Sequence, residues 1–323
     1  MSRVAAIDCG TNSIRLLVAD VTVSPEDSGL AAGRRDLRDI YRTMKIVRLG
    51  QGVDATGRLA DEALERTRAA LVDYAAIAVR KGVERIRMVA TSATRDASNR
   101  EDFFAMVRET LGVEAEVITG DEEARLSFTG AVGDLDPEDG PFVVTDIGGG
   151  STELVVGTWD GVRADITAAH SADVGCVRLT ERCLHSDPPT DEEVREAEKV
   201  TRQILDDAFA AVDCSGARTW VGVAGTVTTL SAIAQELPEY DPVAIHLSHV
   251  SQKRVEQITE GLLGMSHDER AAIGAMHPGR VDVIGGGALV VKVLAEELAE
   301  RAGISAMTVS EHDILDGIAL SIS

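Results

Sequence analysis

Cysteines, basic residues and long apolar runs are all scarce in this chain of 323 residues. The four cysteines form no CxxC pair and are scattered through segments of periodic apolar character. Because disulfide frameworks and zinc sites need closely grouped ligands, this scatter argues against both. We therefore expect buried thiols in a reducing compartment. The cysteines are Cys9, Cys176, Cys183 and Cys214.

No apolar run approaches the roughly 18 residues that a membrane-spanning helix needs. The chain leads from Met1 directly into a predicted strand that contains one basic residue and Asp8. That is not the pattern of a secretory signal peptide. The sequence therefore predicts a cytoplasmic protein without a membrane partner.

Acidic residues outnumber basic residues by 54 to 32, and the formal net charge is −22. Nucleic-acid-binding proteins carry basic patches, so nucleic acid is excluded as a partner. A field of this sign also repels any other polyanion at long range. Local arginines and a metal ion would have to hold such a ligand.

Residues 142–158, FVVTDIGGGSTELVVGT, predict two strands joined by a turn of three glycines. Glycine can adopt positive φ angles, which let backbone N–H groups converge on an anion without a Cβ atom in the way. The hydroxyls of the following residues add donors. We therefore predict a phosphate-binding turn, although a tight glycine hairpin alone would give the same pattern. The predicted phosphate-binding residues are Gly148, Gly149, Gly150 and Ser151.

Asp146 ends the first of these strands, where a carboxylate would repel phosphate. The same carboxylate can hold a divalent cation that bridges to phosphate oxygens, and Glu153 could join it. The alternative is that Asp146 only caps the turn.

The pattern occurs a second time in residues 4–20, VAAIDCGTNSIRLLVAD. Alignment of the two segments places Asp8 on Asp146, Gly10 on Gly148 and Ser13 on Ser151, with apolar strands on both sides. A repeat of this length predicts two α/β domains of similar topology, each with a phosphate-binding hairpin that faces a shared cleft. Chance similarity of two glycine turns is the alternative.

Periodicity and turn residues predict the remaining elements. We expect a polar loop over 23–39 that contains Arg34, Arg35 and Arg38, and a helix that begins near 98 just after Thr91, Ser92 and Arg95. The expected strands are 3–21 (as two), 40–49, 84–90, 114–118, 161–170, 219–223 and 305–309, and the further expected helices are 60–82, 121–133, one from 175, 190–211, one after 223, 279–298 and 312–322.

Three of these segments carry polar residues where open α/β sheets bind ligands. Arg95 could bind phosphate or only pair with Asp96, and Glu122 and Glu123 could act in catalysis or only stabilise the helix dipole. Thr226, in the turn VAGTVTTL, offers a hydroxyl at the start of a helix.

Five segments together resemble the exopolyphosphatase/guanosine pentaphosphate phosphohydrolase (Ppx/GppA) family of the actin-like ATPase superfamily. They are IDCGTNSIRLLVAD (7–20), TSATRDASNR (91–100), TGDEEARLSFTG (119–130), DIGGGSTEL (146–154) and VAGTVTTL (223–230). They occur in the family's order and span nearly the whole chain. The resemblance implies two duplicated actin-like (ribonuclease H-like) domains with an interdomain cleft, domain I being 1–130 plus 310–323 and domain II 131–309.

The resemblance also implies an activity, the hydrolysis of the terminal phosphate of inorganic polyphosphate. In the family the catalytic glutamate directly precedes Ala, which here is Glu123, with Glu122 as the fallback. It implies Mg²⁺ or Mn²⁺ held by Asp146, Glu153 and Asp8. The implied substrate-binding residues are Gly10, Thr11, Asn12, Ser13, Thr91, Ser92, Arg95, Gly148, Gly149, Gly150, Ser151 and Thr226, with Gly175 and Arg178 near the same site.

Two other functions stay open at the level of sequence. Removal of the 5′-terminal phosphate of guanosine pentaphosphate would use the same site, and the residues do not separate the two substrates. A non-hydrolytic sensor of an alarmone or nucleotide is the second alternative, which the presence of Glu123, Asp146 and Glu153 together disfavours. The partner is thus inorganic polyphosphate or guanosine pentaphosphate, and the resemblance allows a homodimer.

Overall fold

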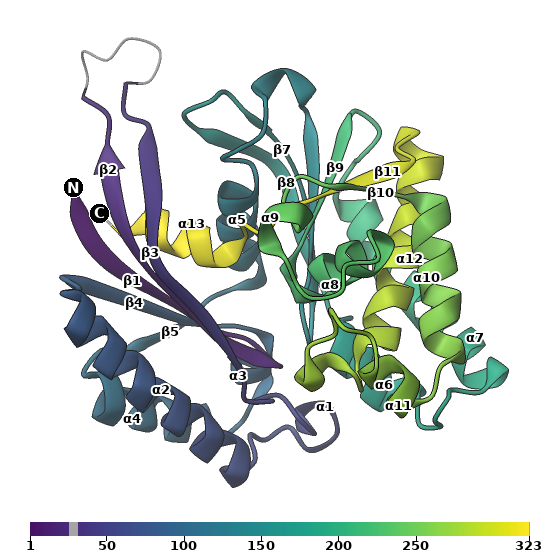
Figure 1. Cartoon of the computed structure of the whole chain (residues 1–323), viewed down its shortest axis with the longest axis horizontal. Coiled ribbons are helices and arrows are strands. Elements are labelled where there is room, and N and C mark those ends of the chain that lie inside the picture. The colour runs from purple at the N-terminus through teal and green to yellow at the C-terminus, as the bar shows by residue number, and fades with distance from the viewer. Residues whose placement is uncertain (26–31, 323) are drawn as a thin grey trace. The chain divides into compact units, whose positions relative to one another are not determined.

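Both predicted hairpins form, and each begins a β-sheet in the computed structural model, which describes residues 1–25 and 32–322 (Figure 1). The chain divides into two units. The first unit contains Met1–Pro137, Trp159–Asp165 and the segment from Asp313, and the second contains Glu138–Thr158 and Ile166–His312. The chain therefore returns to the first unit at its C-terminal end.

The first unit has a five-stranded sheet in the order β3-β2-β1-β4-β5. Strands β1 to β3 pair antiparallel, while β4 and β5 run parallel to β1. The strands are β1 (Ser2–Cys9), β2 (Ser13–Val23), β3 (Arg35–Ile46), β4 (Arg85–Ala90) and β5 (Ala115–Val117). The helices are α1 (Val53–Thr56), α2 (Asp61–Lys81), α3 (Ser92–Asp96), α4 (Arg100–Leu111), α5 (Gly120–Ala131) and α13 (Ile314–Ser321).

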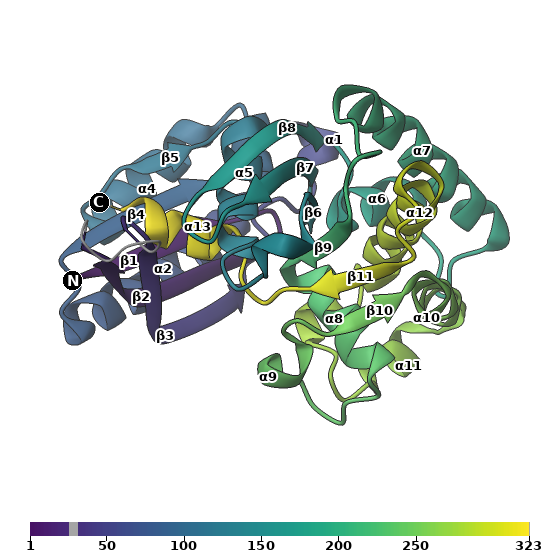
Figure 2. The same ribbon diagram turned by 90° about the horizontal axis from the view of Figure 1, so that it is seen from above.

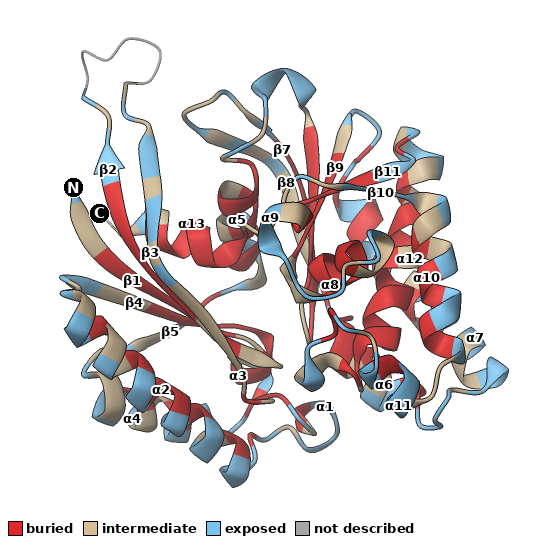
Figure 3. Ribbon diagram, viewed as in Figure 1, coloured by how far each residue is buried: buried red, intermediate tan, exposed pale blue. Residues whose placement is uncertain are grey.

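Strand β1 is buried on both faces because successive side chains point to opposite sides of a sheet. Ala5 and Ile7 pack in one cluster with residues of α2 and α4, whereas Val4 and Ala6 pack in another with residues of α13. Figure 3 shows exposed outer faces on α2 and α4, whereas α13 is buried over most of its length. The first hairpin is thus anchored in a two-sided core that fixes the position of its turn.

Helices α5 and α13 pack together at very close range. A Cβ atom on Gly317 would overlap the carbonyl oxygen of Leu126, and one on Gly130 would overlap that of Asp313. Asp313 caps α13, where its side chain accepts a hydrogen bond from the Leu315 N–H at 3.0 Å. This contact fixes α5, which carries Glu122 and Glu123 in its first turn.

The second unit has a six-stranded sheet in the order β10-β11-β9-β6-β7-β8. Its part β8-β7-β6-β9-β11 has the same order as β3-β2-β1-β4-β5. The strands are β6 (Phe142–Ile147), β7 (Thr152–Trp159), β8 (Ala164–Ala172), β9 (Thr219–Val223), β10 (His249–Ser251) and β11 (Ala306–Val309). The predicted duplicated α/β class is therefore confirmed.

Helix α12 lies at the centre of the helices of this unit and contacts α6, α7, α8 and α10 (Figure 2). The helices are α6 (Cys176–Cys183), α7 (Asp191–Ala211), α8 (Ala224–Ala234), α9 (Pro242–Ile245), α10 (Gln252–Gly264), α11 (His267–Ala271) and α12 (Ile284–Ala302). Helix α12 begins five residues later than predicted, because Pro278–Arg280 form a 3₁₀ turn instead. The predicted buried thiols are confirmed, since all four cysteines are buried and free.

The predicted polar loop over 23–39 is wrong in part. Strands β2 and β3 pair as far as Val23 and Arg35, and the Arg38 guanidinium binds the Asp20 carboxylate at 2.6 Å. The backbone ladder needs no apolar side chains, so these exposed polar residues extend the hairpin. The part of the predicted loop at 26–31 lies outside the described residues. Within 1–25 and 32–322, no helix has the length and hydropathy that a membrane crossing requires.

Candidate active site

The turns of the two hairpins are closed by the same hydrogen bond. The Gly10 N–H donates to the Ser13 carbonyl at 2.9 Å, and the Gly148 N–H donates to the Ser151 carbonyl at 3.0 Å. Neither Gly10 nor any of Gly148, Gly149 and Gly150 adopts a positive φ angle, so the predicted reason for the glycines of the second turn is wrong. The structural reason is close approach, because a Cβ on Gly148 would lie 3.1 Å from the Ser151 oxygen.

In the second unit, the start of helix α6 determines which way the turn points. The Cys176 N–H donates to the Gly148 carbonyl at 3.0 Å, and the Val177 N–H donates to the Gly149 carbonyl at 2.9 Å. In a trans peptide the C=O and the next N–H point in opposite directions. The N–H groups of Gly149 and Gly150 therefore point away from α6, where they can bind an anion.

In the first unit, the segment after β3 orients the other turn in the same way. The Gly50 N–H donates to the Thr11 carbonyl at 2.8 Å, and the Arg48 N–H donates to the Asn12 carbonyl at 2.8 Å. By the same geometry, the N–H groups of Asn12 and Ser13 point away from this segment. Both turns thus present consecutive backbone donors, which is the arrangement of a phosphate-binding nest.

Gly175 precedes α6 and touches the second turn directly. A Cβ atom at this position would lie 2.6 Å from the Gly149 carbonyl carbon and 2.7 Å from the Gly148 oxygen. Such a contact would push the turn away from the helix. Gly175, which the sequence marked only by resemblance, is therefore required by the position of the Gly148–Gly149 backbone.

We expect Gly175→Ala to lower kcat/KM for phosphate release by about tenfold or more, since small displacements of binding groups are costly in catalysis. Gly216→Ala is the matched control, because a Cβ at Gly216 meets no atom within 4 Å. Steady-state kinetics on both variants test the prediction. A fully active Gly175→Ala protein would show that the position of the turn is unimportant.

The two hairpins differ at one position that decides their charge. In β1–β2, Asp8 pairs with Arg15, whereas in β6–β7 the equivalent Asp146 pairs with Glu153. Directly opposite residues lie on the same face of a sheet, and like charges there repel. Asp146 and Glu153 are both buried, so a cation beside this carboxylate pair would offset their repulsion, as Arg15 does beside Asp8 in the first hairpin.

The Arg15 guanidinium binds two buried acids of the first unit. Its Nη2 donates to the Asp8 Oδ2 at 2.7 Å, and its Nη1 donates to Asp313. Burial raises the pKa of Asp8, although Arg15 opposes this effect. The Asp8 Oδ1 atom is buried and accepts no hydrogen bond from the residues that the structure describes. Sequence reasoning missed Arg15, because an arginine in an apolar strand gave no indication of the acid opposite it.

The donor set fits a hard divalent cation such as Mg²⁺, which prefers carboxylate oxygens and water. Asp146 and Glu153 supply two facing carboxylates, and Ser171 donates to the Glu153 Oε1 at 2.7 Å, which orients that group. The bare Oδ1 of Asp8 is an acceptor of the same kind in the first unit. The predicted metal-binding residues therefore have the chemistry that such an ion requires.

The short helix α3 links the predicted substrate-binding residues of the first unit to Glu123. Thr11 Oγ1 and Ser92 Oγ lie 2.9 Å apart, and the Thr91 N–H donates to the Cys9 carbonyl at 3.3 Å. Three residues after Ser92, the Arg95 Nη1 donates to the Glu123 Oε2 at 3.1 Å.

The two candidate bases on α5 lie in different environments. Glu123 is buried beside Arg95. The Glu122 side chain is 44% exposed and pairs with Arg87 at 2.7 Å. Glu122 is therefore occupied in a surface ion pair, while Glu123 lies with the predicted phosphate-binding residues.

Thr226 lies beside Cys176 of α6, and the N–H group of Cys176 binds the second turn. Asp146 pairs with Val223, the last residue of β9, and the chain then enters α8 through Ala224, which has a φ of 71°. A Cβ on Gly287 would contact both Thr226 and Cys176, so these two side chains lie together. Strained backbone of this kind is concentrated at functional sites.

Arg280 is a further residue of this region that sequence reasoning missed. Its guanidinium covers Gly225, where a Cβ atom would overlap it, and its Nη1 donates to the Thr229 Oγ1 at 3.0 Å. It therefore adds a positive charge to the N-terminal end of α8. No spacing in the sequence distinguishes it from other arginines. Arg178, the weak candidate of the sequence, pairs with Asp173 at 3.4 Å.

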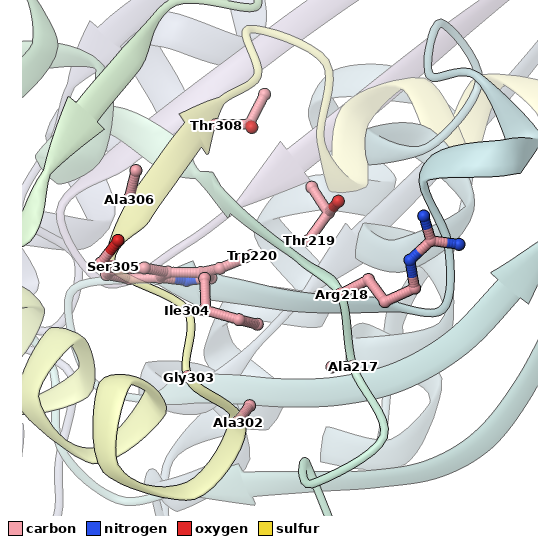
Figure 4. A pocket seen from close by; sticks show the side chains of 10 residues that line it. All are labelled: Ala217, Arg218, Thr219, Trp220, Ala302, Gly303, Ile304, Ser305, Ala306 and Thr308. Atoms are coloured by element: carbon pink, nitrogen blue, oxygen red, sulfur yellow. The ribbon is translucent and has the colours of Figure 1, made fainter.

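A separate pocket of about 490 Å³ opens at the amino-terminal ends of β9 and β11 (Figure 4). Its lining includes Arg218, Trp220, Ile304 and Ser305. The glycine turn and Thr226 follow the carboxyl ends of β6 and β9. The pocket therefore lies at the opposite end of these strands and is not part of the site.

The fold and these turns define a two-unit α/β protein with a duplicated phosphate-binding hairpin. The profile of the Ppx/GppA phosphatase family matches residues 23–322, and the chain belongs to this family. It is 58% identical over 328 residues to "Exopolyphosphatase 2" of Mycobacterium tuberculosis, with 100% of this chain and 99% of the relative covered.

Solved structures agree with this assignment. The crystal structure of an exopolyphosphatase-like protein superposes with a TM-score of 0.91 at 42% identity and covers 99% of this chain and 98% of its own. The Ppx/GppA enzyme of Aquifex aeolicus superposes with a TM-score of 0.77 at 31% identity, with 99% of both chains covered.

Proposed function

We propose that this protein is an exopolyphosphatase, which hydrolyses the terminal phosphoanhydride of inorganic polyphosphate. The observation that carries the proposal is the ion pair of the buried Glu123 with the half-buried Arg95, in the unit whose turn presents the N–H groups of Asn12 and Ser13. Phosphoryl transfer needs positioning and charge neutralisation more than covalent chemistry. The 58% identity to an exopolyphosphatase over the full chain supports the same substrate.

In the proposed mechanism, Glu123 accepts a proton from the water that attacks the terminal phosphorus. Arg95 holds the Glu123 carboxylate in place with one N–H group and binds phosphate oxygens with others. The backbone N–H groups of Gly149 and Gly150 and the hydroxyl of Thr226 neutralise charge on the phosphates.

In this proposal Asp146 and Glu153 would hold the metal ion, and Asp8 is the candidate ligand of the first unit. A bound Mg²⁺ or Mn²⁺ would offset the negative charge that develops on the transferred group. Arg15 keeps Asp8 in place in the first hairpin.

The test is phosphate release by the purified full chain with polyphosphate, guanosine pentaphosphate and ATP as separate substrates. We expect the highest kcat/KM with polyphosphate. Higher kcat/KM with guanosine pentaphosphate would assign the sister activity to this protein. Binding without release from any substrate would indicate a sensor instead.

Replacement of Arg95 by Ala should lower kcat/KM on polyphosphate about ten- to a hundredfold, because charge-assisted hydrogen bonds are worth roughly 1.5–3 kcal/mol each. Arg68→Ala is the control, since Arg68 is exposed and pairs with Glu65 on the surface of α2. Initial rates over a range of substrate concentrations measure the effect. Equal rates for the two variants would exclude Arg95 from phosphate binding.

We also propose a cytoplasmic location, which the four free buried thiols support. A homodimer and the exclusion of nucleic acid remain part of the proposal, the second because of the net charge of −22. Light scattering on the purified chain tests the oligomeric state.

A further inference from the structure

Arg95 lines a groove of about 430 Å³ in the first unit, and the other lining residues have no part in the proposed mechanism. Its lining includes the polar residues Arg95, Arg100 and Thr119 and the apolar residues Phe104 and Ile118. A cavity of this size accommodates a drug-sized molecule rather than one orthophosphate. All of its lining belongs to the unit that contains Glu123.

Arg95 connects this groove to the proposed base. Its Nη1 donates to the Glu123 Oε2 at 3.1 Å and to the Ile118 carbonyl at 3.1 Å. Within the described residues, both bonds from this side chain start at Nη1, and a guanidinium carries five N–H donors in a fixed fork. The remaining donors can therefore bind anionic oxygens while Nη1 holds Glu123.

Arg100 supplies the second positive charge of the groove. It is exposed and is the first residue of α4, and among the described residues its guanidinium takes part in no ion pair. A cation at a helix N-terminus is unfavourable, because the helix dipole is positive there. An anion in the groove would be stabilised both by Arg100 and by this end of α4.

Glu101 also lines the groove and opposes an anion there. Arg95 is paired with Glu123, so the two arginines are matched by two acids here, whereas acids outnumber basic residues by 54 to 32 in the whole chain. The groove therefore lacks the excess of negative charge that the whole protein carries, and Arg100 is its cation without an ion pair among the described residues. Long-range repulsion makes such local cations the means by which a polyanion can be held.

We infer that this groove binds the phosphate units that follow the terminal one in a condensed phosphate chain, with Arg100 as a determinant of chain-length preference. The inference rests on the proposed function, and it places a second phosphate contact in the first unit. Arg95 then contacts the substrate at the terminal unit and at the start of the groove. Arg100 contacts units further along the chain, which short substrates do not have.

The test compares kcat/KM on long-chain polyphosphate and on tripolyphosphate for the wild type, Arg100→Gln and Arg108→Gln. Arg108 is the matched control, since it lies on the same helix but pairs with Glu114 at 2.6 Å outside the groove. We expect Arg100→Gln to reduce the ratio of long-chain to tripolyphosphate kcat/KM about five- to tenfold, and Arg108→Gln to leave the ratio unchanged.

Arg100→Glu provides a second test in which loss of folding is not expected, because an acid at the first position of α4 interacts favourably with the helix dipole. It should reduce the ratio further. An unchanged ratio in both Arg100 variants would overturn the inference. So would a change confined to inhibition by orthophosphate, which would make the groove a product site, or to hydrolysis of guanosine pentaphosphate, which would make it a nucleoside site. A wild type inactive on polyphosphate would instead refute the proposed function.

Discussion

Replacement of Glu123 by Gln is expected to lower the rate of phosphate release from polyphosphate by about a hundredfold or more, with little change in substrate affinity. General acid–base catalysis contributes roughly 10²–10⁴ to a rate, and Gln keeps the shape of Glu123 but cannot accept the proton. The group is buried and accepts a hydrogen bond from Arg95 at 3.1 Å, and an amide of the same shape can occupy this space. Single-turnover kinetics measure the loss in the chemical step directly.

Glu122→Gln is the matched control for this prediction. Glu122 lies one residue earlier in the same helical turn, and its side chain pairs with Arg87 on the surface. Surface ion pairs contribute about 0–1 kcal/mol, so activity should stay near that of the wild type. An inactive Glu122→Gln protein together with an active Glu123→Gln protein would reverse the assignment within the pair.

The second large effect concerns the facing carboxylates of the second hairpin. We expect Asp146→Asn to raise the magnesium concentration needed for half-maximal rate by about tenfold or more, because an amide oxygen carries no charge for the ion. The variant relieves the repulsion between Asp146 and Glu153, which pair directly across the ladder. Its folding stability without metal should therefore be kept or increased.

Magnesium titrations of activity, together with thermal unfolding without metal, separate the two effects. Asp207→Asn is the control, since it removes one exposed carboxylate from α7 and changes the net charge by the same amount. A magnesium titration of Asp146→Asn that matches the wild type would exclude Asp146 as a ligand and leave it as a turn residue.

The duplicated fold could be predicted because the two hairpins repeat a whole strand-turn-strand pattern. Asp8, Gly10 and Ser13 align with Asp146, Gly148 and Ser151, and the turns share one hydrogen bond. Helix ends could also be predicted from the sequence. Helix α2, for example, ends with Arg80 and Lys81 in its last turn and Gly82 as its C-cap. The extension of β2 and β3 could not be predicted. Arg35 and Arg38 are held in the strand by backbone hydrogen bonds, which the polarity of their side chains does not indicate.

The site was predictable only where short segments carry its residues. The different charges of the two hairpins could not be predicted without the strand register. The register places Arg15 opposite Asp8 and Glu153 opposite Asp146. A glycine is needed at position 175 because the Gly149 backbone lies against it. The Arg280 guanidinium likewise contacts Gly225 from a segment far away in sequence. Tertiary packing creates both contacts, so no local pattern could indicate them.

The central claim is that a water molecule activated by Glu123 attacks the terminal phosphorus of the chain. Hydrolysis of polyphosphate in water enriched in a heavy oxygen isotope tests it most directly, with both products analysed by mass spectrometry. We expect one heavy oxygen in each released orthophosphate and none in the shortened chain. Heavy oxygen in the shortened chain would show attack at an internal phosphorus and would contradict the account.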